Sequence, residues 1–380
     1  MDFIDLAFQQ QRIIEKLEKN IKTVLNHGKY IMGPEVGKLE GTLANYVGVK
    51  HAISCASGTD ALLMALMAYN IGPGDAVFTS PFTFIATAEV ITLLGATPVF
   101  VDIDPNTFNI DPKKLEQAIT AVKKPVGDRP MIMPKAVIPI DLFGLLADYN
   151  AINTIARENN LLIIEDAAQS FGGEYKGKKA CFFGGIACTS FFPAKPLGCY
   201  GDGGMCFTGD DRLAEILRSI RVHGQGGHKY DNIRIGINGR LDTLQAAILL
   251  AKFDIFPEEI ELRQKAAKNY ADLLSPIHAI KTPEVPDGYK SAWAQYSLLA
   301  VNEKQRDILM ERLKQSNIPT AIYYPKPLHR QEAFSYLGYK KGDFPISEAI
   351  ANRIFSLPMH PYLKFEDQEK IADIINAPGE

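Results

Sequence analysis

Lys195 lies in a segment whose neighbouring residues could attach an aldehyde cofactor. Ser190 stands five residues before it, a glycine-rich stretch over 198–204 follows it, and Asp166 ends an apolar run upstream. A lysine amine can form a Schiff base, hydroxyls and backbone amides can hold a phosphate, and a carboxylate can keep a pyridine nitrogen protonated. Together these groups predict a site for pyridoxal phosphate (PLP).

The setting of Lys195 favours chemistry over a surface role. Most lysines are solvated, but this one follows Phe191 and Phe192 and is bracketed by prolines. An apolar surrounding lowers the pKa of an amine. We therefore expect Lys195 to be the catalytic residue.

Asp166 and Gln169 follow the apolar run 161–164, which is typical of a strand covered on both faces. A buried carboxylate needs a cation or hydrogen bonds, and a pyridinium N–H is such a partner. The paired ring could then accept electrons from a substrate carbanion. Gln169 could reach the ring oxygen. A purely structural acid explains Asp166 equally well when it is taken alone.

Two further segments could contact the cofactor. Gly58 and Thr59 stand where a strand turns into a helix, and the free amides there suit a phosphate. An ordinary helix cap by Ser57 or Thr59 is the commoner explanation of that pattern. An aromatic residue of Phe82-Thr83-Phe84 could stack on the cofactor ring, with core packing as the more probable explanation for either phenylalanine alone.

These residues need a sheet to hold them, and the sequence predicts one. Short β-type runs alternate with helical stretches after residue 50, a pattern that builds a mostly parallel sheet. We expect strands at 51–55, 76–79, 98–102, 135–140, 161–165, 186–191 and 204–208, and helices near 59–70, 83–94, 111–121 and 147–158. Ligands bind beyond the carboxyl ends of such strands.

The alternation stops after the last of these strands. Long helical stretches are expected at 242–254 and 257–275, then a strand near 296–301 and a helix at 303–316. We predict a large PLP-binding domain over 1–255 and a small C-terminal α/β domain over 256–380.

Composition excludes several classes of function. The 380 residues carry a net charge of -3 without a basic block, which argues against nucleic acid as a partner. No apolar run is long enough to span a membrane, and the acidic start is unlike a signal peptide. Five cysteines without Cys-x-x-Cys spacing indicate a reduced, cytoplasmic setting. The histidines show no metal-ligand spacing, so no metal is expected.

The chain resembles the DegT/DnrJ/EryC1/StrS family of sugar aminotransferases over essentially its whole length. These are PLP enzymes of fold type I, the aspartate-aminotransferase fold, with a mostly parallel seven-stranded sheet. The resemblance rests on segments 33–36, 57–62, 81–87, 165–170, 190–204, 236–241 and 324–329. Some members have a histidine in place of the lysine and are dehydratases, so Lys195 favours a transaminase.

The resemblance implies a role for each matching residue. Lys195 would be the Schiff-base lysine and the general acid/base, and Asp166 the partner of the ring nitrogen. The implied cofactor-binding set is Gly58, Thr59, Phe84, Asp166, Gln169, Ser190, Lys195 and Asn238, and the implied substrate-binding set is Arg240, Tyr323, Tyr324 and His329. Asn238 would reach the phosphate of the other subunit, which implies a homodimer with shared active sites.

Within the family, segments 199–204, 240–247 and 356–363 resemble enzymes that aminate carbon 3 of UDP-2-acetamido-2-deoxy-3-oxo sugars. The expected partners are a UDP-linked keto-sugar and L-glutamate, in a surface-glycan pathway such as lipopolysaccharide synthesis. Tyr323 stands where the uronic-acid members have histidine. The sequence therefore leaves open whether the sugar carries a carboxylate at carbon 6. Three alternatives also stay open: a 4-aminotransferase of 4-keto-6-deoxy sugars, a nicotinamide-dependent sugar oxidoreductase, and a non-catalytic regulator that senses a nucleotide sugar. The oxidoreductase would need a glycine-rich turn that the segment 56–59 lacks.

Overall fold

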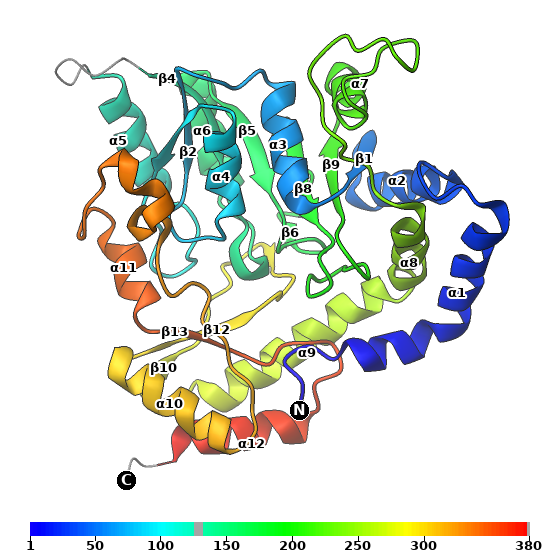
Figure 1. The fold of residues 1–380 in the computed structure, drawn as a ribbon. Helices are drawn as coiled ribbons and strands as arrows, with labels where there is room; N and C mark the ends of the chain where they lie inside the picture. The colour runs from blue at the N-terminus through cyan, green and yellow to red at the C-terminus, as the bar shows by residue number, and fades with distance from the viewer. Residues whose placement is uncertain (125–131, 378–380) are drawn as a thin grey trace.

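Seven strands form the main sheet of the computed structural model, which describes residues 1–124 and 132–377. They are β1 (His51–Cys55), β2 (Asp75–Thr79), β3 (Thr97–Phe100), β4 (Met133–Ile138), β5 (Leu162–Asp166), β8 (Ile186–Ser190) and β9 (Gly204–Thr208). Their order is β1-β9-β8-β5-β4-β2-β3. Only β9 runs antiparallel to its neighbours. The predicted, mostly parallel seven-stranded sheet is confirmed (Figure 1).

Helices cover both faces of this sheet, because successive strand residues point to opposite sides. Ile53 and Val77 pack under one layer, and Ala52 and Phe78 under the other. The first layer contains α3 (Gly58–Ala68), α4 (Ala86–Leu93) and α7 (Asp211–Ile220). The second contains α2 (Pro34–Val47), α5 (Pro112–Val122), α6 (Tyr149–Asn159) and α8 (Thr243–Phe253). This double cover explains why the strands are almost wholly apolar.

The C-terminal part has its own small sheet and core. Strands β10 (Ile280–Lys281), β12 (Tyr296–Ala300) and β13 (Ile354–Leu357) pack with α9 (Phe256–Leu274), α10 (Glu303–Gln315) and α12 (Phe365–Asn376). Helix α9 begins with Phe256 in the core of the large sheet and ends with Leu274 in the small core. The domain boundary at residue 255 stays a prediction, and α9 lies across it.

Shorter elements complete the chain. A third sheet, in the order β11-β6-β7, joins β6 (Glu174–Tyr175) and β7 (Lys178–Lys179) to β11 (Tyr289–Lys290). The 3-10 turns are η1 (Leu142–Gly144), η2 (Leu328–Arg330) and η3 (Glu332–Leu337), and α11 (Pro345–Ala351) precedes β13. Leu328 of η2 and Phe334 of η3 pack against Ala88 of α4 and Phe100 of β3. In the described parts of the chain, no helix is long and apolar enough to cross a membrane.

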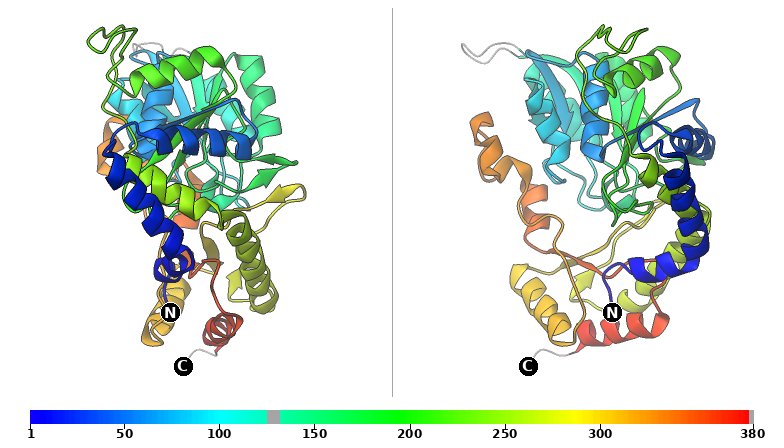
Figure 2. Two further views of the ribbon diagram at one scale, coloured as in Figure 1. Left: turned by 90° about the vertical axis from the view of Figure 1, so that its right-hand side faces the viewer. Right: turned by 45° about the vertical axis from the view of Figure 1, so that its right-hand side comes forward.

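The N-terminal helix α1 (Leu6–His27) links the two parts of the molecule. Its residues Ile13 and Leu17 pack on α8, and Gln9 donates to Glu259 at the start of α9 (2.8 Å). The segment before it reaches the C-terminal part, which the views in Figures 1 and 2 show. We infer that α1 and α9 together fix how the two parts are placed.

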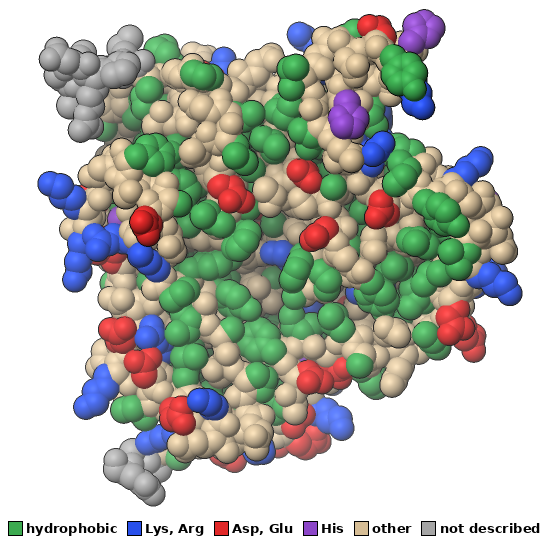
Figure 3. All heavy atoms as spheres, in the orientation of Figure 1, with side chains coloured by type: hydrophobic (Ala, Val, Ile, Leu, Met, Phe, Trp, Pro, Cys, Tyr) green, Lys and Arg blue, Asp and Glu red, His purple; other side chains and the backbone are tan. Residues whose placement is uncertain are grey.

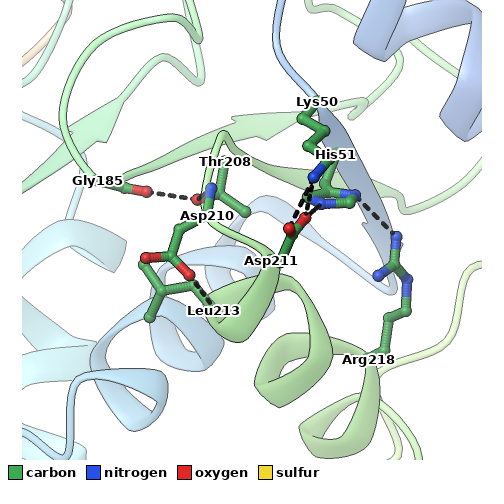
Figure 4. A network of polar contacts seen from close by, with 8 residues as sticks. All are labelled: Lys50, His51, Gly185, Thr208, Asp210, Asp211, Leu213 and Arg218. Atoms are coloured by element: carbon green, nitrogen blue, oxygen red, sulfur yellow. Dashed lines mark hydrogen bonds and ion pairs between the residues drawn. The ribbon is translucent and has the colours of Figure 1, made fainter.

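A polar cluster ties the edge strand β1 to helix α7 (Figure 4). Asp211, in the first turn of α7, contacts both His51 and Lys50. Arg218, two turns further along α7, lies 3.4 Å from Nδ1 of His51. Because a guanidinium can only donate, Nδ1 accepts there and Nε2–H donates to Asp211. The cluster lies at the surface, away from the cavity described next.

Candidate active site

A cavity of about 440 Å³ opens at the carboxyl ends of the central strands. It is large enough for a cofactor and part of a substrate. The sequence-predicted residues that line it are Gly58, Thr59, Phe84, Asp166, Gln169, Ser190, Lys195, Tyr323 and Tyr324. Segments far apart in the sequence thus meet at one place.

One end of the cavity is a helix start suited to an anion. Ser57 caps α3 by accepting from the amide of Asp60 (3.0 Å), so the ordinary capping role exists. Gly58 and Thr59 open the same helix and also line the cavity. A Cβ on Gly58 would lie 2.6 Å from Cβ of Ser190, so only glycine fits there. The free amides and hydroxyls at this end can hold a phosphate.

Lys195 lies on the loop between β8 and β9. Its amide donates to the carbonyl of Phe192 (2.9 Å), and a Cβ on Gly198 would lie 2.4 Å from the carbonyl oxygen of Pro193. The loop is therefore a tight turn that holds the lysine in one place. Burial lowers the pKa of the Lys195 amine to about 8, and the charge of Asp166 opposes that shift. An amine with this pKa is partly neutral near neutral pH.

Asp166 ends β5 and is 4% exposed. Its Oδ2 accepts from the hydroxyl of Thr87 (2.7 Å), and its Oδ1 accepts from the amide of Ala168 (3.2 Å). Burial raises the pKa of Asp166, while these two hydrogen bonds and the charge of Lys195 counteract the rise. A cationic N–H arriving in the cavity would stabilise the carboxylate further.

Glu165, the neighbour of Asp166, faces the opposite side of the sheet. It accepts from the amides of Cys181 (2.6 Å) and Phe183 (2.7 Å). Burial raises its pKa well above the ordinary value, and the nearby Asp141 raises it further. Of the acidic pair in the sequence, only Asp166 can therefore take part in the chemistry of the cavity.

Gln169 presents its donor group to the cavity. Its Oε1 accepts from the amide of Phe143 (2.8 Å), and its Nε2 donates to the hydroxyl of Tyr324 (3.1 Å). Since the carbonyl side is taken, the NH₂ side is the one available to a ligand oxygen. This arrangement suits the predicted contact to the ring oxygen.

Of the two phenylalanines that follow β2, one is buried in the core and the other lines the cavity. Phe82 is 1% exposed and packs against Phe143 and Tyr324. Phe84 is 55% exposed and lines the cavity beside Phe192. The aromatic residue predicted to stack on the cofactor is thus the one that is free to do so.

Asn238 and Arg240 do not line this cavity. Both lie in a second hollow beside it, of about 450 Å³. Asp202 belongs to both hollows and separates them. Asn238 therefore does not reach the phosphate end within its own subunit.

His329, which the family resemblance assigns to the substrate, lies outside the wall of the cavity. It does not line the cavity, its side chain is fully buried, and its Nε2 lies 2.9 Å from Glu348. It packs against Phe344. His329 is thus held by Glu348 and Phe344 in the buried η2 turn.

Some residues of the cavity went unrecognised in the sequence, chiefly Thr87, Asp202 and Gln295. Thr87 carries no local signal, since a threonine in a helix is unremarkable. Asp202 stood in the glycine-rich stretch after Lys195 and could have been found there. Gln295 precedes β12 in the C-terminal part, and only the tertiary fold brings it to the cavity.

The residues present fit PLP. One cavity is lined by an amine, an amide donor, a helix start and a buried carboxylate, next to an exposed aromatic ring. Among the described residues, that amine is the one cation that acts on the carboxylate. In the described part of the chain, no group of three or more acidic, histidine or cysteine residues could hold a metal ion. The fold and the site define a PLP-dependent enzyme.

Comparison with known proteins identifies the family. Residues 11–376 match the DegT/DnrJ/EryC1/StrS aminotransferase family, and the chain belongs to it. It is 51% identical to UDP-2-acetamido-2-deoxy-3-oxo-D-glucuronate aminotransferase of Pseudomonas aeruginosa, over 96% of each chain. It is 44% identical to a pleiotropic regulatory protein of Geobacillus stearothermophilus, over 98% of this chain and 96% of that one.

A solved structure agrees with the fold. The crystal structure of a DegT DnrJ EryC1 StrS aminotransferase from Brucella abortus is 51% identical and superimposes with a TM-score of 0.94, covering 99% of this chain and 98% of that one. The predicted family, fold type and aminotransferase class are confirmed, as is PLP as the cofactor.

Proposed function

We propose that this enzyme transfers the amino group of L-glutamate to carbon 3 of a UDP-linked 2-acetamido-2-deoxy-3-oxo-hexose or its uronic acid. The products are 2-oxoglutarate and a 3-amino sugar. One observation carries the proposal: Lys195, Asp166 and Gln169 line a single cavity in a chain that is 51% identical, nearly end to end, to an enzyme named for this substrate class. A surface-glycan pathway in the cytoplasm would use such a product.

The working unit is a homodimer with shared active sites. Among the described residues that line the cavity, Lys195 is the only cation, and Asp166 and Asp202 are acidic. Glutamate and a nucleotide diphosphate bring several negative charges, which need cationic partners. Arg240 lies in the adjacent hollow, and its guanidinium is the group we assign to the substrate bound by the partner subunit. Asn238, in the same hollow, reaches the partner's cofactor phosphate.

The surface of the molecule supports such an assembly. Figure 3 shows hydrophobic side chains spread across the middle of one face. Large exposed hydrophobic residues include Tyr30, Ile31 and Met32 near the second hollow, Phe84 and Phe192 at the cavity, and Tyr230 and Ile235 on the loop after α7. Ile235 is 86% exposed. Exposed apolar surface of this extent is typical of a subunit interface.

The residues of the cavity divide the chemistry among them. When bound, PLP supplies an electron sink for the negative charge left on the substrate carbon after a proton leaves. The neutral amine of Lys195 would take that proton at Nζ and would then deliver it to the carbon on the other side of the transferred nitrogen. Asp166 would keep the ring nitrogen protonated, and Gln169 Nε2 would donate to the ring oxygen. Gly58, Thr59 and Ser190 hold the phosphate at the start of α3.

The sugar side of the cavity is formed by the C-terminal part. Tyr323, Tyr324 and Gln295 line it there, and they offer hydroxyl and amide groups to sugar hydroxyls. Burial raises the pKa of both phenols, so both are neutral donors. In place of the histidine of the uronic-acid members, Tyr323 can donate only a neutral hydrogen bond to a carbon-6 carboxylate.

The experiment is an amino-transfer assay on a small panel of substrates. UDP-2-acetamido-2-deoxy-3-oxo-glucose, its uronic acid and a dTDP-4-keto-6-deoxy sugar are each supplied with glutamate, and 2-oxoglutarate is measured. We expect turnover with the two UDP-3-oxo sugars and at least tenfold lower kcat/KM with the 4-keto sugar. Preference for the 4-keto sugar would contradict the proposal. Binding of PLP without sugar-dependent formation of 2-oxoglutarate on any sugar of the panel would contradict the proposal and favour the alternative of a regulator, the role that the name of the Geobacillus relative gives that protein.

A further inference from the structure

Thr87 makes a contact that the known roles of the cavity residues leave unexplained. Its hydroxyl donates to Oδ2 of Asp166 over 2.7 Å, between residues 79 positions apart in the sequence. Thr87 is 1% exposed, lies in the first turn of α4 and lines the cavity. The bond therefore joins a helix of one layer to the end of a central strand.

The other helical threonines with a bonded hydroxyl show how unusual this contact is. In the described chain, such hydroxyls usually donate to the carbonyl four residues earlier in the same helix. This holds for Thr23, Thr42, Thr92, Thr120 and Thr154. That local bond is the expected one for threonine in a helix. Thr87 instead donates its hydrogen bond to a carboxylate far away in the sequence.

The contact leaves Asp166 able to serve a ligand. An ionised carboxylate has about four acceptor positions on its two oxygens, of which Thr87 and Ala168 occupy two. The remaining positions are available to a donor in the cavity. A carboxylate held at both oxygens cannot rotate freely, so its direction is fixed before the cofactor arrives.

We propose that Thr87 is a positioning residue for the reaction: its hydroxyl fixes the orientation of the Asp166 carboxylate and keeps it ionised opposite the cofactor's ring nitrogen. Thr87 lines the cavity, and the hydrogen bond of its hydroxyl goes to Asp166, so we place its effect on the reaction there. Its loss should weaken the protonation of the ring nitrogen and leave substrate binding unchanged.

The test compares Thr87→Val, which keeps the shape and removes the hydroxyl, with Thr87→Ser, which restores the hydroxyl. The matched control is Thr92→Val in the same helix, whose hydroxyl donates to Ala88. In a single-turnover reaction with glutamate, Thr87→Val should lower the maximal rate about 10- to 100-fold, the range for a hydrogen bond to a charged group. The glutamate concentration for half-maximal rate should stay within about twofold.

A second readout does not depend on turnover. With ¹⁵N in the ring of bound PLP, the nitrogen resonance of Thr87→Val should move toward the unprotonated position, while that of Thr92→Val stays with the wild type. Thr87→Ser should match the wild type in resonance and recover the rate to within about threefold. If Thr87→Val does not fold, Thr87→Ala removes the same hydroxyl and is measured in its place.

Three results would overturn the proposal. The first is an unchanged maximal rate in the variant that lacks the hydroxyl. The second is an unchanged ¹⁵N resonance despite a slower rate, and the third is a serine variant as slow as the valine one. The last two would mean that Thr87 only shapes the packing of α4.

Discussion

Gln169 donates through Nε2 to the phenol oxygen of Tyr324 over 3.1 Å. The two residues belong to different parts of the molecule, since Gln169 follows strand β5 and Tyr324 precedes β13. Tyr324 also packs edge-on against Phe82. A segment of the C-terminal part that lines the cavity is thus bonded directly to a cavity residue of the large sheet.

Tyr324→Phe tests that bond. The phenylalanine keeps the packing against Phe82 but leaves Gln169 Nε2 without its partner. A neutral hydrogen bond contributes about 0.5–1.5 kcal/mol, so we expect kcat/KM for the keto-sugar to fall about 2- to 10-fold. The control is Tyr336→Phe, because the Tyr336 hydroxyl bonds only to Thr92 at the surface among the described residues. Equal kcat/KM in both variants would show that the Gln169 bond is not used.

The lowered pKa of Lys195 makes the attachment of PLP dependent on pH. Only the neutral amine attacks the cofactor's aldehyde. Burial lowers the pKa of Lys195 to about 8, so the neutral fraction should rise about fivefold from pH 7 to 8 and less than about twofold from pH 8 to 9. The measurement is the rate at which cofactor-free enzyme regains its visible absorption after PLP is added.

A variant of Asp166 tests the effect of its charge on the pKa of Lys195. The charge of Asp166 raises the pKa of Lys195, so Asp166→Asn should move the rate profile toward lower pH. An ordinary exposed lysine would instead give a rate that rises about tenfold per pH unit through pH 9. Such a rise in the wild type would contradict the burial of the amine.

Mixing subunits tests whether the active sites are shared. Lys195→Ala removes the amine from its own cavity, and Arg240→Ala removes the guanidinium that we assign to the partner's cavity. Each variant alone should be nearly inactive. After unfolding, mixing in equal amounts and refolding, half of the dimers are hybrids with one intact site, so about a quarter of wild-type activity should return. No recovery would mean that Arg240 serves its own subunit.

The structural features that depend on the local pattern of residues can be predicted from the sequence. All seven main strands were expected close to their positions, because apolar runs bounded by turns identify buried strands. Lys195, Asp166 and Gly58 could be placed at one edge, because carboxyl ends of parallel strands share an edge. The helix α2 was missed, since the glycines at 37 and 41 interrupt its apolar pattern.

Other features depend on contacts between distant segments. The bond from Thr87 to Asp166 and the burial of His329 against Glu348 arise only when the chain has folded. The segment around Thr87 does not indicate a contact with Asp166, and the segment around His329 does not indicate a contact with Glu348. The family resemblance predicts that Asn238 reaches the cofactor phosphate of the other subunit, and within its own subunit Asn238 lies in the hollow beside the cavity.

The stability of the protein toward acid should depend on His360. This residue is 5% exposed in the C-terminal part. Burial lowers its pKa to about 4, and the charge of Arg263 lowers it further, while Asp5, Asp2 and Asp367 oppose the shift. The folded-state pKa lies below the ordinary value of 6.5. The unfolded state therefore binds the proton first. The stability that neutral His360 contributes is fully present above pH 6.5 and is lost as the pH falls toward 4.

Replacing His360 with asparagine should remove this dependence. From pH 7.5 to 5 the free energy of unfolding of the wild type should fall by about 2 kcal/mol more than that of His360→Asn. Urea titrations at one fixed protein concentration measure it, since the stability of the proposed dimer would vary with concentration. His278→Asn is the control, because His278 is exposed. Its removal should leave the fall in the free energy of unfolding toward acid pH as in the wild type. Parallel pH curves for wild type and His360→Asn would show that His360 is not the group whose protonation unfolds the protein.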